Sequence, residues 1–374
     1  MATNAADGRL ADVEPFTNTG TTTYPHLYYY YYYYYYYVIG TVARWVGLDP
    51  FQAWSVGGLL VQMVLVAGIG VGIYLVTRRW SVPLLAPLPF VVGTFATFLN
   101  NGGWYTSLDS HAVLWGPFAV FYPLNGETAS LGLSALGLLV ALATYVRVVG
   151  RTRRVVLYAL IGVSANVQSY GFLVGVYRAL FIVAAVVLIS ARARWLVGLS
   201  LALIVIVAPA GPAVARRFGP LAALVFGVLP ALPGVVLLIA RARWQAVIPF
   251  LALIAAASPQ VIATALGIVS KDPFLTYRVA SSADLGVDWR GIVATGAVLV
   301  PLLAIRVAGI HRRVTLWIAF SIAAIVAWTL TATNDLWGAN QEPYRFWLEM
   351  FCLIAFVTVP MAAMAAASYL RWPG

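Results

Sequence analysis

The side chains that could do acid-base chemistry in this chain are few, and they are unevenly placed. All 12 Asp and Glu residues fall in, or at the edge of, alternate connections between apolar segments, whereas the intervening connections carry arginine. Cytoplasmic loops of membrane proteins accumulate Lys and Arg while acids barely influence insertion, so the arginine connections are predicted to be cytoplasmic. Acid-base chemistry is therefore expected on the extracytoplasmic face. The acids are Asp7, Asp12, Glu14, Asp49, Asp109, Glu127, Asp272, Asp284, Asp288, Asp335, Glu342 and Glu349.

Four acid-bearing connections hold polar side chains in irregular sequence. Backbone of this kind survives at membrane depth only where it lines water or protein, so four such loops on one face indicate a cavity there. The loops cover residues 1–53, 100–128, 270–290 and 333–346; beside their acids they contain Tyr24, Pro25, His26, His111, Lys271, Arg278, Arg290 and Arg345.

Asp109, and a set of three later aspartates, each have a functional and a structural interpretation. Asp109 lies two residues before His111 in a turn-rich loop, where it could act as a catalytic acid or base or cap the short helix that follows. Asp272, Asp284 and Asp288 are too widely spaced for a strong metal signature, so neither a metal site nor a cofactor is expected.

The elements that position these residues follow from composition. The chain has 374 residues, of which 62% are hydrophobic and 9% charged, and its mean hydropathy is +0.88. A soluble domain is about a quarter charged, so a polytopic membrane protein is predicted. The net charge of +11 reflects arginines at the ends of membrane spans, and no nucleic-acid partner is expected. The single cysteine, Cys352, allows no disulfide within the chain.

Runs of about 20 apolar residues match a hydrocarbon core of roughly 30 Å. We predict an all-α protein of about eleven transmembrane helices with interfacial helices in its first external loops. Its parts are an extracytoplasmic loop, 1–53, and a transmembrane domain, 54–374, with the C-terminus in the cytoplasm of a cell membrane. The predicted spans are 54–77, 82–99, 129–147, 155–171, 173–190, 195–211, 219–240, 244–269, 291–309, 314–332 and 347–369.

The uninterrupted tyrosine run from Tyr28 to Tyr37 suits the membrane surface better than its core. A helix of this sequence has phenols on every face, and tyrosine prefers the headgroup level, where its ring is apolar and its hydroxyl is wet. The predicted topology leaves residues 1–53 outside without a preceding apolar segment, so we expect one upstream span to be missing from this sequence.

Two short stretches resemble a known family of membrane enzymes. The sequence TTTYPHLYYYYYYYYYYVIG, followed by an apolar run that ends at Arg78 and Arg79, resembles the end of the first external loop of GT-C glycosyltransferases. The acidic stretch DGRLADVEPF, residues 7–16, is similar in placement to the family segment that supplies the catalytic Asp. The late stretch QEPYRF, residues 341–346, resembles an arginine-bearing loop that holds lipid phosphate in several such enzymes.

The resemblance implies an inverting transfer of sugar from a polyprenyl-phosphate donor to an extracytoplasmic glycan, lipid or protein. It assigns the base to Asp7, with Asp12 and Glu14 as alternatives, and donor contacts to Tyr24, Pro25, His26 and Arg345. A carboxylate can take the proton of the acceptor hydroxyl, and a cation can hold the leaving phosphate. Other cationic candidates are Lys271, Arg278 and Arg290, and Glu342 can bind substrate or only pair with Arg345.

Two other classes remain open. A transporter is expected to carry ionisable groups within its spans. Glu349 is the only acid within the predicted spans, which argues against a proton- or sodium-coupled carrier. A non-catalytic subunit that binds lipid phosphate or assists assembly is the second alternative. The motifs of hydrolases, G-x-S-x-G and HExxH, are absent from the sequence.

Overall fold

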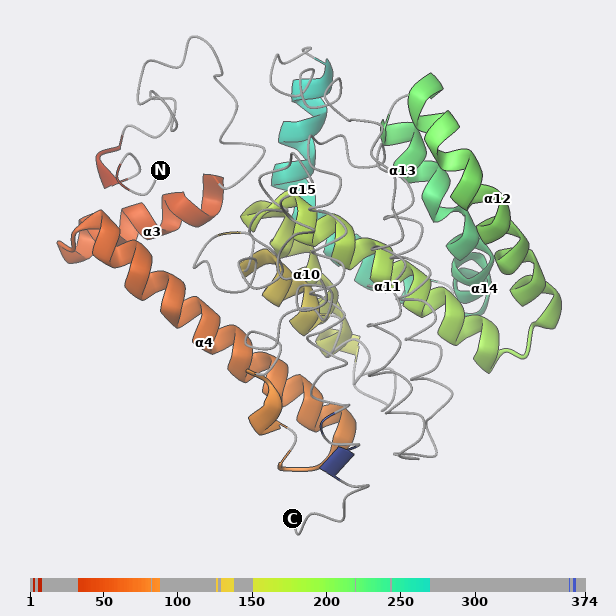
Figure 1. The fold of residues 1–374 in the computed structure, drawn as a ribbon, viewed down its shortest axis with the longest axis horizontal. Helices are drawn as coiled ribbons and strands as arrows, with labels where there is room; N and C mark the ends of the chain where they lie inside the picture. Colours follow the sequence, from red (N-terminus) through yellow and green to blue (C-terminus); the bar gives the residue numbers. More distant parts are fainter. Residues whose placement is uncertain are drawn as a thin grey trace, which may run out of the picture.

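In the part of the chain that the structure describes, every regular element is helical (Figure 1). The computed structural model describes residues 3, 6–8, 33–81, 83–87, 126, 129–137, 151–218, 220–242, 244–269, 363, 366 and 367. Within these residues the predicted all-α class is confirmed. The helices are α3 (Tyr33–Val46), α4 (Pro50–Thr77), η1 (Pro83–Leu85), an unlabelled helix over 129–137, α10 (Arg151–Val167), α11 (Ser169–Ser190), α12 (Arg194–Phe218), α13 (Pro220–Val228), η2 (Leu229–Ala231), α14 (Leu232–Ala242) and α15 (Trp244–Val269).

Three of the described helices are long and apolar enough to cross a membrane. They contain the stretches Pro50–Tyr74, Gly171–Ser190 and Val247–Leu266, and shorter apolar helices lie at Val155–Val167, Arg194–Val207 and Val225–Arg241. The chain therefore has the helices of a membrane protein. The number of about eleven spans stays a prediction, because several predicted spans lie outside the described residues.

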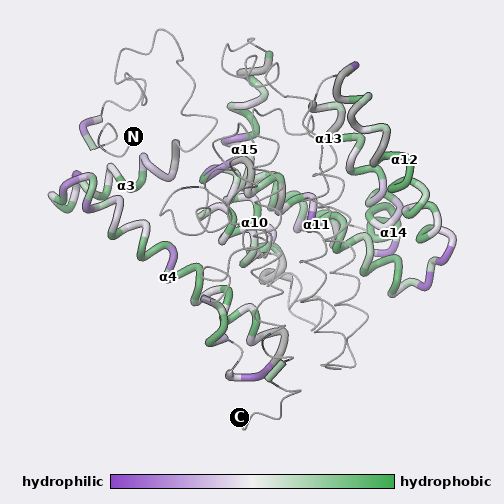
Figure 2. Tube along the Cα trace, viewed as in Figure 1, coloured by the Kyte–Doolittle hydropathy of each residue, from purple (hydrophilic) through white to green (hydrophobic). Residues whose placement is uncertain are grey.

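Helix α4 illustrates how the sequence sets both ends of such a helix. The carboxylate of Asp49 accepts hydrogen bonds from the backbone N–H groups of Phe51 and Gln52, at 2.9 and 3.1 Å, and so caps the start. Trp54 and Tyr74 lie twenty residues apart, which is about 30 Å along an α-helix and equals the thickness of a hydrocarbon core. Figure 2 shows hydrophobic residues along most of α4 and hydrophilic ones where it ends.

The predicted boundaries agree with the structure to within a few residues for most of these segments. Residues 244–269 were predicted as one span and form α15, while the span predicted at 54–77 begins earlier, at Pro50. The turn expected between Ser164 and Tyr170 is reduced to Gln168, which separates α10 from α11. The span predicted at 219–240 is divided into α13, η2 and α14, since prolines at 230 and 233 interrupt it.

Small residues let the helices approach one another at backbone distance. A methyl group on Gly162 of α10 would overlap the carbonyl of Leu253 in α15, and one on Gly171 of α11 would overlap the hydroxyl of Ser130. Gly234 of α14 lies equally close to Ala184 of α11. Helices in a bilayer gain stability from such close van der Waals packing, because lipid tails are as apolar as leucine.

Buried serines join the 129–137 helix to α10 and α11. The Ser130 hydroxyl lies 2.9 Å from the carbonyl of Ser164, which also accepts from the N–H of Gln168, and 2.8 Å from the carbonyl of Gln168, so its one proton can be donated to either carbonyl. The Ser134 hydroxyl lies 2.7 Å from the carbonyl of Gly171 and 3.0 Å from the Ser164 hydroxyl. The carbonyl groups near the α10–α11 turn are thus satisfied without water, as burial requires.

Asn166 of α10 binds the backbone of α15 beside its internal Pro259. Its amide nitrogen donates to the carbonyl of Ala256 at 2.7 Å, and its carbonyl oxygen accepts from the N–H of Gln260 at 3.2 Å. A regular α-helix joins these two backbone groups to each other. Pro259 supplies no N–H for the carbonyl of Ala255, which instead accepts from the Ser258 hydroxyl at 2.7 Å.

The contacts also give the relative directions of the helices. Leu65 and Gly68 of α4 meet Gly132 and Leu136 in the same order, so these two helices are parallel. Helix α11 runs the same way, since Gly171 and Gly175 face Ser130 and Ser134. Helix α10 runs oppositely, because Ser130 bonds to Gln168 while Gly137 packs on Ile161, near the middle of α10.

Helix α15 runs parallel to α10. The ring of Tyr158 lies 5.3 Å from that of Phe250 at one level, and Asn166 meets Ala256 and Gln260 two turns further along. These directions are the ones that alternate membrane crossings require. One end of the bundle, called the acid-bearing end, therefore holds Asp49 and the α10–α11 turn. The other, called the arginine end, holds the end of α4, the start of α10 and the α11–α12 turn.

We expect Gly162→Ala to lower the free energy of unfolding by about 1–3 kcal/mol, because the added methyl group forces α10 away from α15. Gly198→Ala in α12 is the matched control. Nothing lies within 4 Å of a methyl group at Gly198, so the change should be neutral or add up to about 1 kcal/mol through helix propensity. Denaturant unfolding in mild detergent measures both; equal effects would contradict close backbone packing at Gly162.

We expect Asn166→Leu to destabilise the protein by about 1–3 kcal/mol, since it leaves the Ala256 carbonyl without its side-chain donor in an apolar setting. Thr264→Val in α15 is the control, because its hydroxyl makes a local bond to the carbonyl of Gln260 at 2.8 Å. Its effect should stay within about 0.5 kcal/mol. Thermal unfolding of the purified variants compares them, and an Asn166→Leu protein as stable as the control would refute the role of this contact.

Candidate functional site

The predicted base, Asp7, is exposed and lies in a turn against helix α3. Its backbone N–H donates to the carbonyl of Thr3 at 2.9 Å. Gly8 follows with φ of +70°, a left-handed conformation that glycine adopts without strain. A methyl group built on Gly8 would lie 3.6 Å from Nη1 of Arg44, so the guanidinium of this exposed residue packs beside the turn. The turn that carries the Asp7 carboxylate and the cation of Arg44 thus lie together, although Gly8 and Arg44 are 36 positions apart in the sequence.

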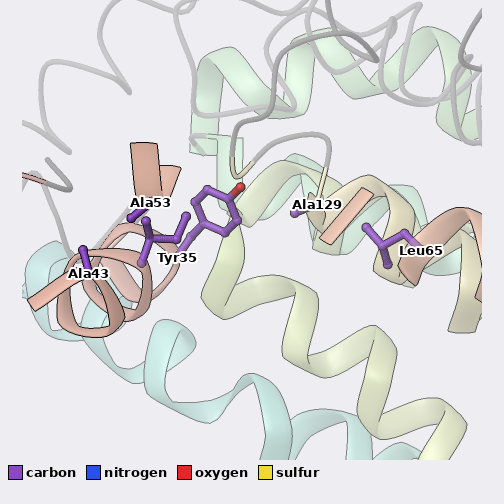
Figure 3. Close-up of a cluster of buried hydrophobic side chains, with 6 residues drawn as sticks. Tyr35, Ala43, Ala53, Leu65 and Ala129 are labelled. Carbon is purple, nitrogen blue, oxygen red and sulfur yellow. The ribbon is translucent and has the colours of Figure 1, made fainter. Parts of the chain in front are cut away.

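Helix α3, which carries Arg44, is held in place by a small apolar cluster. Tyr35, Ile39 and Ala43 form its buried stripe, at the i, i+4, i+8 spacing of one helix face. The stripe packs on residues of three other helices, as Figure 3 shows for the Tyr35 side chain, which extends toward Ala129. The other face of α3 exposes Tyr37, Val38, Val42, Trp45 and Val46.

The connection between α3 and α4 is tight and directional. Gly47 has φ of +72° and the N–H of Leu48 donates to the carbonyl of Ala43 at 3.0 Å, which is the 6→1 bond of a Schellman motif. Asp49 then caps α4. Because only three residues separate the helices, the position of Arg44 is determined by the start of α4.

Burial raises the pKa of the Tyr35 phenol well above its ordinary value, and the neighbouring Tyr36 adds to this effect. The two rings meet edge to face, with centroids 5.2 Å apart. The tyrosine run therefore contributes a neutral, structural side chain at this position. An interfacial aromatic helix was predicted here, and α3 covers its last five tyrosines and continues to Val46.

Asp7 is the only predicted site residue within the described part of the chain. The other predicted residues lie outside it, and their roles stay predictions: Asp12, Tyr24, Pro25, His26, Asp109, Lys271, Arg278, Arg290, Glu342 and Arg345.

Sequence reasoning overlooked Arg178, which lies within one turn of the middle of α11. Its side chain is fully buried (0% exposed), and it shares the helix face of Gly171 and Gly175. A charged residue in the centre of a membrane-crossing helix is costly and usually functional. The signal was visible in the sequence, because Arg178 is the only charged residue between positions 155 and 191.

Sequence reasoning also overlooked the pair Arg216 and Arg217, at the end of α12. Helix α12 begins at the arginine end and packs along α13, η2 and α14, so its last turn lies toward the acid-bearing end. The guanidinium of Arg217 lies 5.6 Å from the ring centre of Phe218. The cations at the end of α12 thus lie toward the acid-bearing end, apart from the alternating arginine connections.

Among the described residues, no three His, Cys, Asp or Glu side chains gather in a way that could hold a metal ion. No family model, curated protein or solved structure matches the chain. The geometry of the Asp7 turn, α3 and α4 therefore carries the functional argument. Chemically, the turn carries a carboxylate that can accept a proton, and the guanidinium packed against its Gly8 can bind an anion.

We expect Ala43→Leu to displace α3 from the bundle, because Ala43 is fully buried and the cluster has no room for three more carbon atoms. The substitution should lower the free energy of unfolding by about 1–3 kcal/mol. Val42→Leu, one residue away on the exposed face, should change stability by less than about 0.5 kcal/mol. Amide hydrogen exchange of α3 reports the displacement; protection that is equal in both variants would mean that the cluster does not hold the helix.

Proposed function

We propose that the chain is a membrane glycosyltransferase that moves a sugar from a polyprenyl-phosphate donor to an acceptor at the acid-bearing end of the bundle. The observation that supports it is the packing of the Asp7–Gly8 turn against Arg44. Glycosyl transfer needs a base for the acceptor and a cation for the leaving phosphate, and this pair supplies one of each.

In this proposal the acceptor hydroxyl attacks the anomeric carbon of the donor sugar while the bond from that carbon to the phosphate oxygen breaks. The Asp7 carboxylate takes the hydroxyl proton, and the lipid phosphate leaves with the electron pair of the broken bond. Arg44 binds the phosphate oxygens; guanidinium is suited to this because its planar donors can contact two oxygens at once. Helix α3 positions Arg44, and its exposed aromatic and aliphatic face suits the membrane surface, where such a donor resides.

Asp7→Asn should reduce transfer from a polyprenyl-phosphate sugar at least about 100-fold, because the amide cannot accept the proton. Asp49→Asn is the matched control: it also removes a carboxylate at the acid-bearing end, but asparagine caps a helix as well as aspartate does. Transfer assays in lipid use a panel of radiolabelled polyprenyl-phosphate sugars with crude cell-envelope acceptor. Unchanged turnover in Asp7→Asn would remove Asp7 as the base.

Arg44→Ala should weaken donor binding in the same assay, seen as a raised KM.

A transporter is the second candidate, and Arg178 is the observation that favours it. A buried cation in the middle of α11 is the kind of group that marks a substrate or ion pathway. Flux of anionic substrates through proteoliposomes tests this function. Flux that Arg178→Leu abolishes, in a chain with no transferase activity, would favour the transporter over the glycosyltransferase.

A further inference from the structure

Two arginines occupy a backbone conformation that normally belongs to glycine. Among the residues that the structure describes, the only non-glycine residues with positive φ are Arg78 (59°) and Arg192 (52°). Arg78 directly follows the last residue of α4, and Arg192 lies two residues after the last residue of α11. Both are long apolar helices that end at the arginine end of the bundle. Helices commonly end on a left-handed residue, but that residue is usually glycine.

The hydrogen bonds confirm that both arginines stand at helix C-termini. The N–H of Arg78 donates to the carbonyl of Tyr74 at 2.7 Å. After α11, the N–H of Ala193 donates to the carbonyl of Leu188 at 3.2 Å, the 6→1 bond of a Schellman motif with Arg192 in the glycine position. A side chain with a Cβ is disfavoured in this conformation, so the arginine side chain must contribute something that glycine lacks.

That contribution is not an ion pair with a described carboxylate. The only acids in the described part of the chain are Asp7 and Asp49, and Asp49 lies at the opposite end of α4. Arg78, Arg192 and Arg194 are all exposed, and Arg78 lies 5.6 Å from the ring centre of Tyr74. Within the described residues, therefore, no carboxylate supplies their counter-charge.

Exposed tryptophans place both turns at the level of lipid headgroups. Trp80 is 80% exposed and its ring lies 4.8 Å from that of Tyr74, while Trp195 is 72% exposed directly after Arg194. Tryptophan and tyrosine concentrate at this level of a bilayer. The sequence ARARW of residues 191–195 recurs without change at residues 240–244, where α14 gives way to α15, and Arg241 is exposed there. Figure 2 shows the hydrophilic α11–α12 turn next to the apolar helices that it joins.

We propose that these turns form a docking surface for the headgroup phosphates of anionic phospholipids in the leaflet at the arginine end. Guanidinium groups hold phosphate oxygens with paired hydrogen bonds, and the adjacent tryptophans determine the depth at which the turns lie in the bilayer. The left-handed arginines project from the helix ends, where the apolar spans give way to the headgroup layer. This surface is separate from the Asp7–Arg44 arrangement and is independent of the proposed transfer reaction.

The test uses the full chain in nanodiscs of phosphatidylcholine with or without phosphatidylglycerol, and compares the wild type with Arg78→Gly/Arg192→Gly. Glycine fits both backbone positions, so the variant should melt at the same or a higher temperature in pure phosphatidylcholine. Its retention of phosphatidylglycerol, counted by native mass spectrometry, should fall about 5-fold for each arginine removed. The thermal stabilisation that phosphatidylglycerol gives the wild type should fall with it.

Arg78→Lys/Arg192→Lys serves as the second variant, because it keeps the charge and the backbone strain. It should retain more phosphatidylglycerol than the glycine variant does, although less than the wild type, since lysine lacks the planar fork. Equal phosphatidylglycerol retention by the glycine variant and the wild type would overturn the proposal. So would a loss of stability in the glycine variant of the same size in both lipid compositions, which would show that the arginines serve the fold alone.

Discussion

Backbone polar groups inside an apolar bundle cannot obtain hydrogen bonds from water, and this constraint shapes the contact between α10 and α15 on which the described core depends. Gly162 lets the two backbones meet, and Asn166 then binds a carbonyl and an N–H of α15 one turn apart. The serines of the 129–137 helix satisfy the carbonyls around the α10–α11 turn in the same manner. Polar side chains here act as substitutes for solvent, and small residues bring them within range.

The directions imposed by these contacts separate the charges of the described chain into two ends. At one end α3 lies over the start of α4 and holds Arg44 against the Asp7 turn. At the other, arginines and exposed tryptophans follow α4 and α11. A proton acceptor with a nearby cation at one end, and cations alone at the other, suit a protein whose chemistry and lipid contacts occur on different sides. Arg178, buried between the two ends, is the charge that this division does not explain.

Much of the helical architecture was predictable from hydropathy and helix-terminal chemistry. The span at 244–269 coincides with α15, because Arg243 and Trp244 mark its start and a mostly apolar run without charged residues follows. The turn between α10 and α11 was predicted only to within the polar stretch from Ser164 to Tyr170, since in the structure it consists of one residue, Gln168. Arg178 and the Arg216–Arg217 pair were missed for another reason: the predicted pattern of arginines covers only the alternate, cytoplasmic connections, and these three residues lie outside those connections.

The sequence by itself determined that the described part of the chain forms apolar helices and that the acids keep to alternate connections, because hydropathy and the ends of helices are local properties. Only the tertiary structure decided which side chains meet. Arg44 approaches Gly8, and Asn166 binds the backbone of α15, so each contact joins residues distant in sequence. Arg178 is buried. Such contacts depend on helix rotation and close packing between spans, which no local pattern encodes.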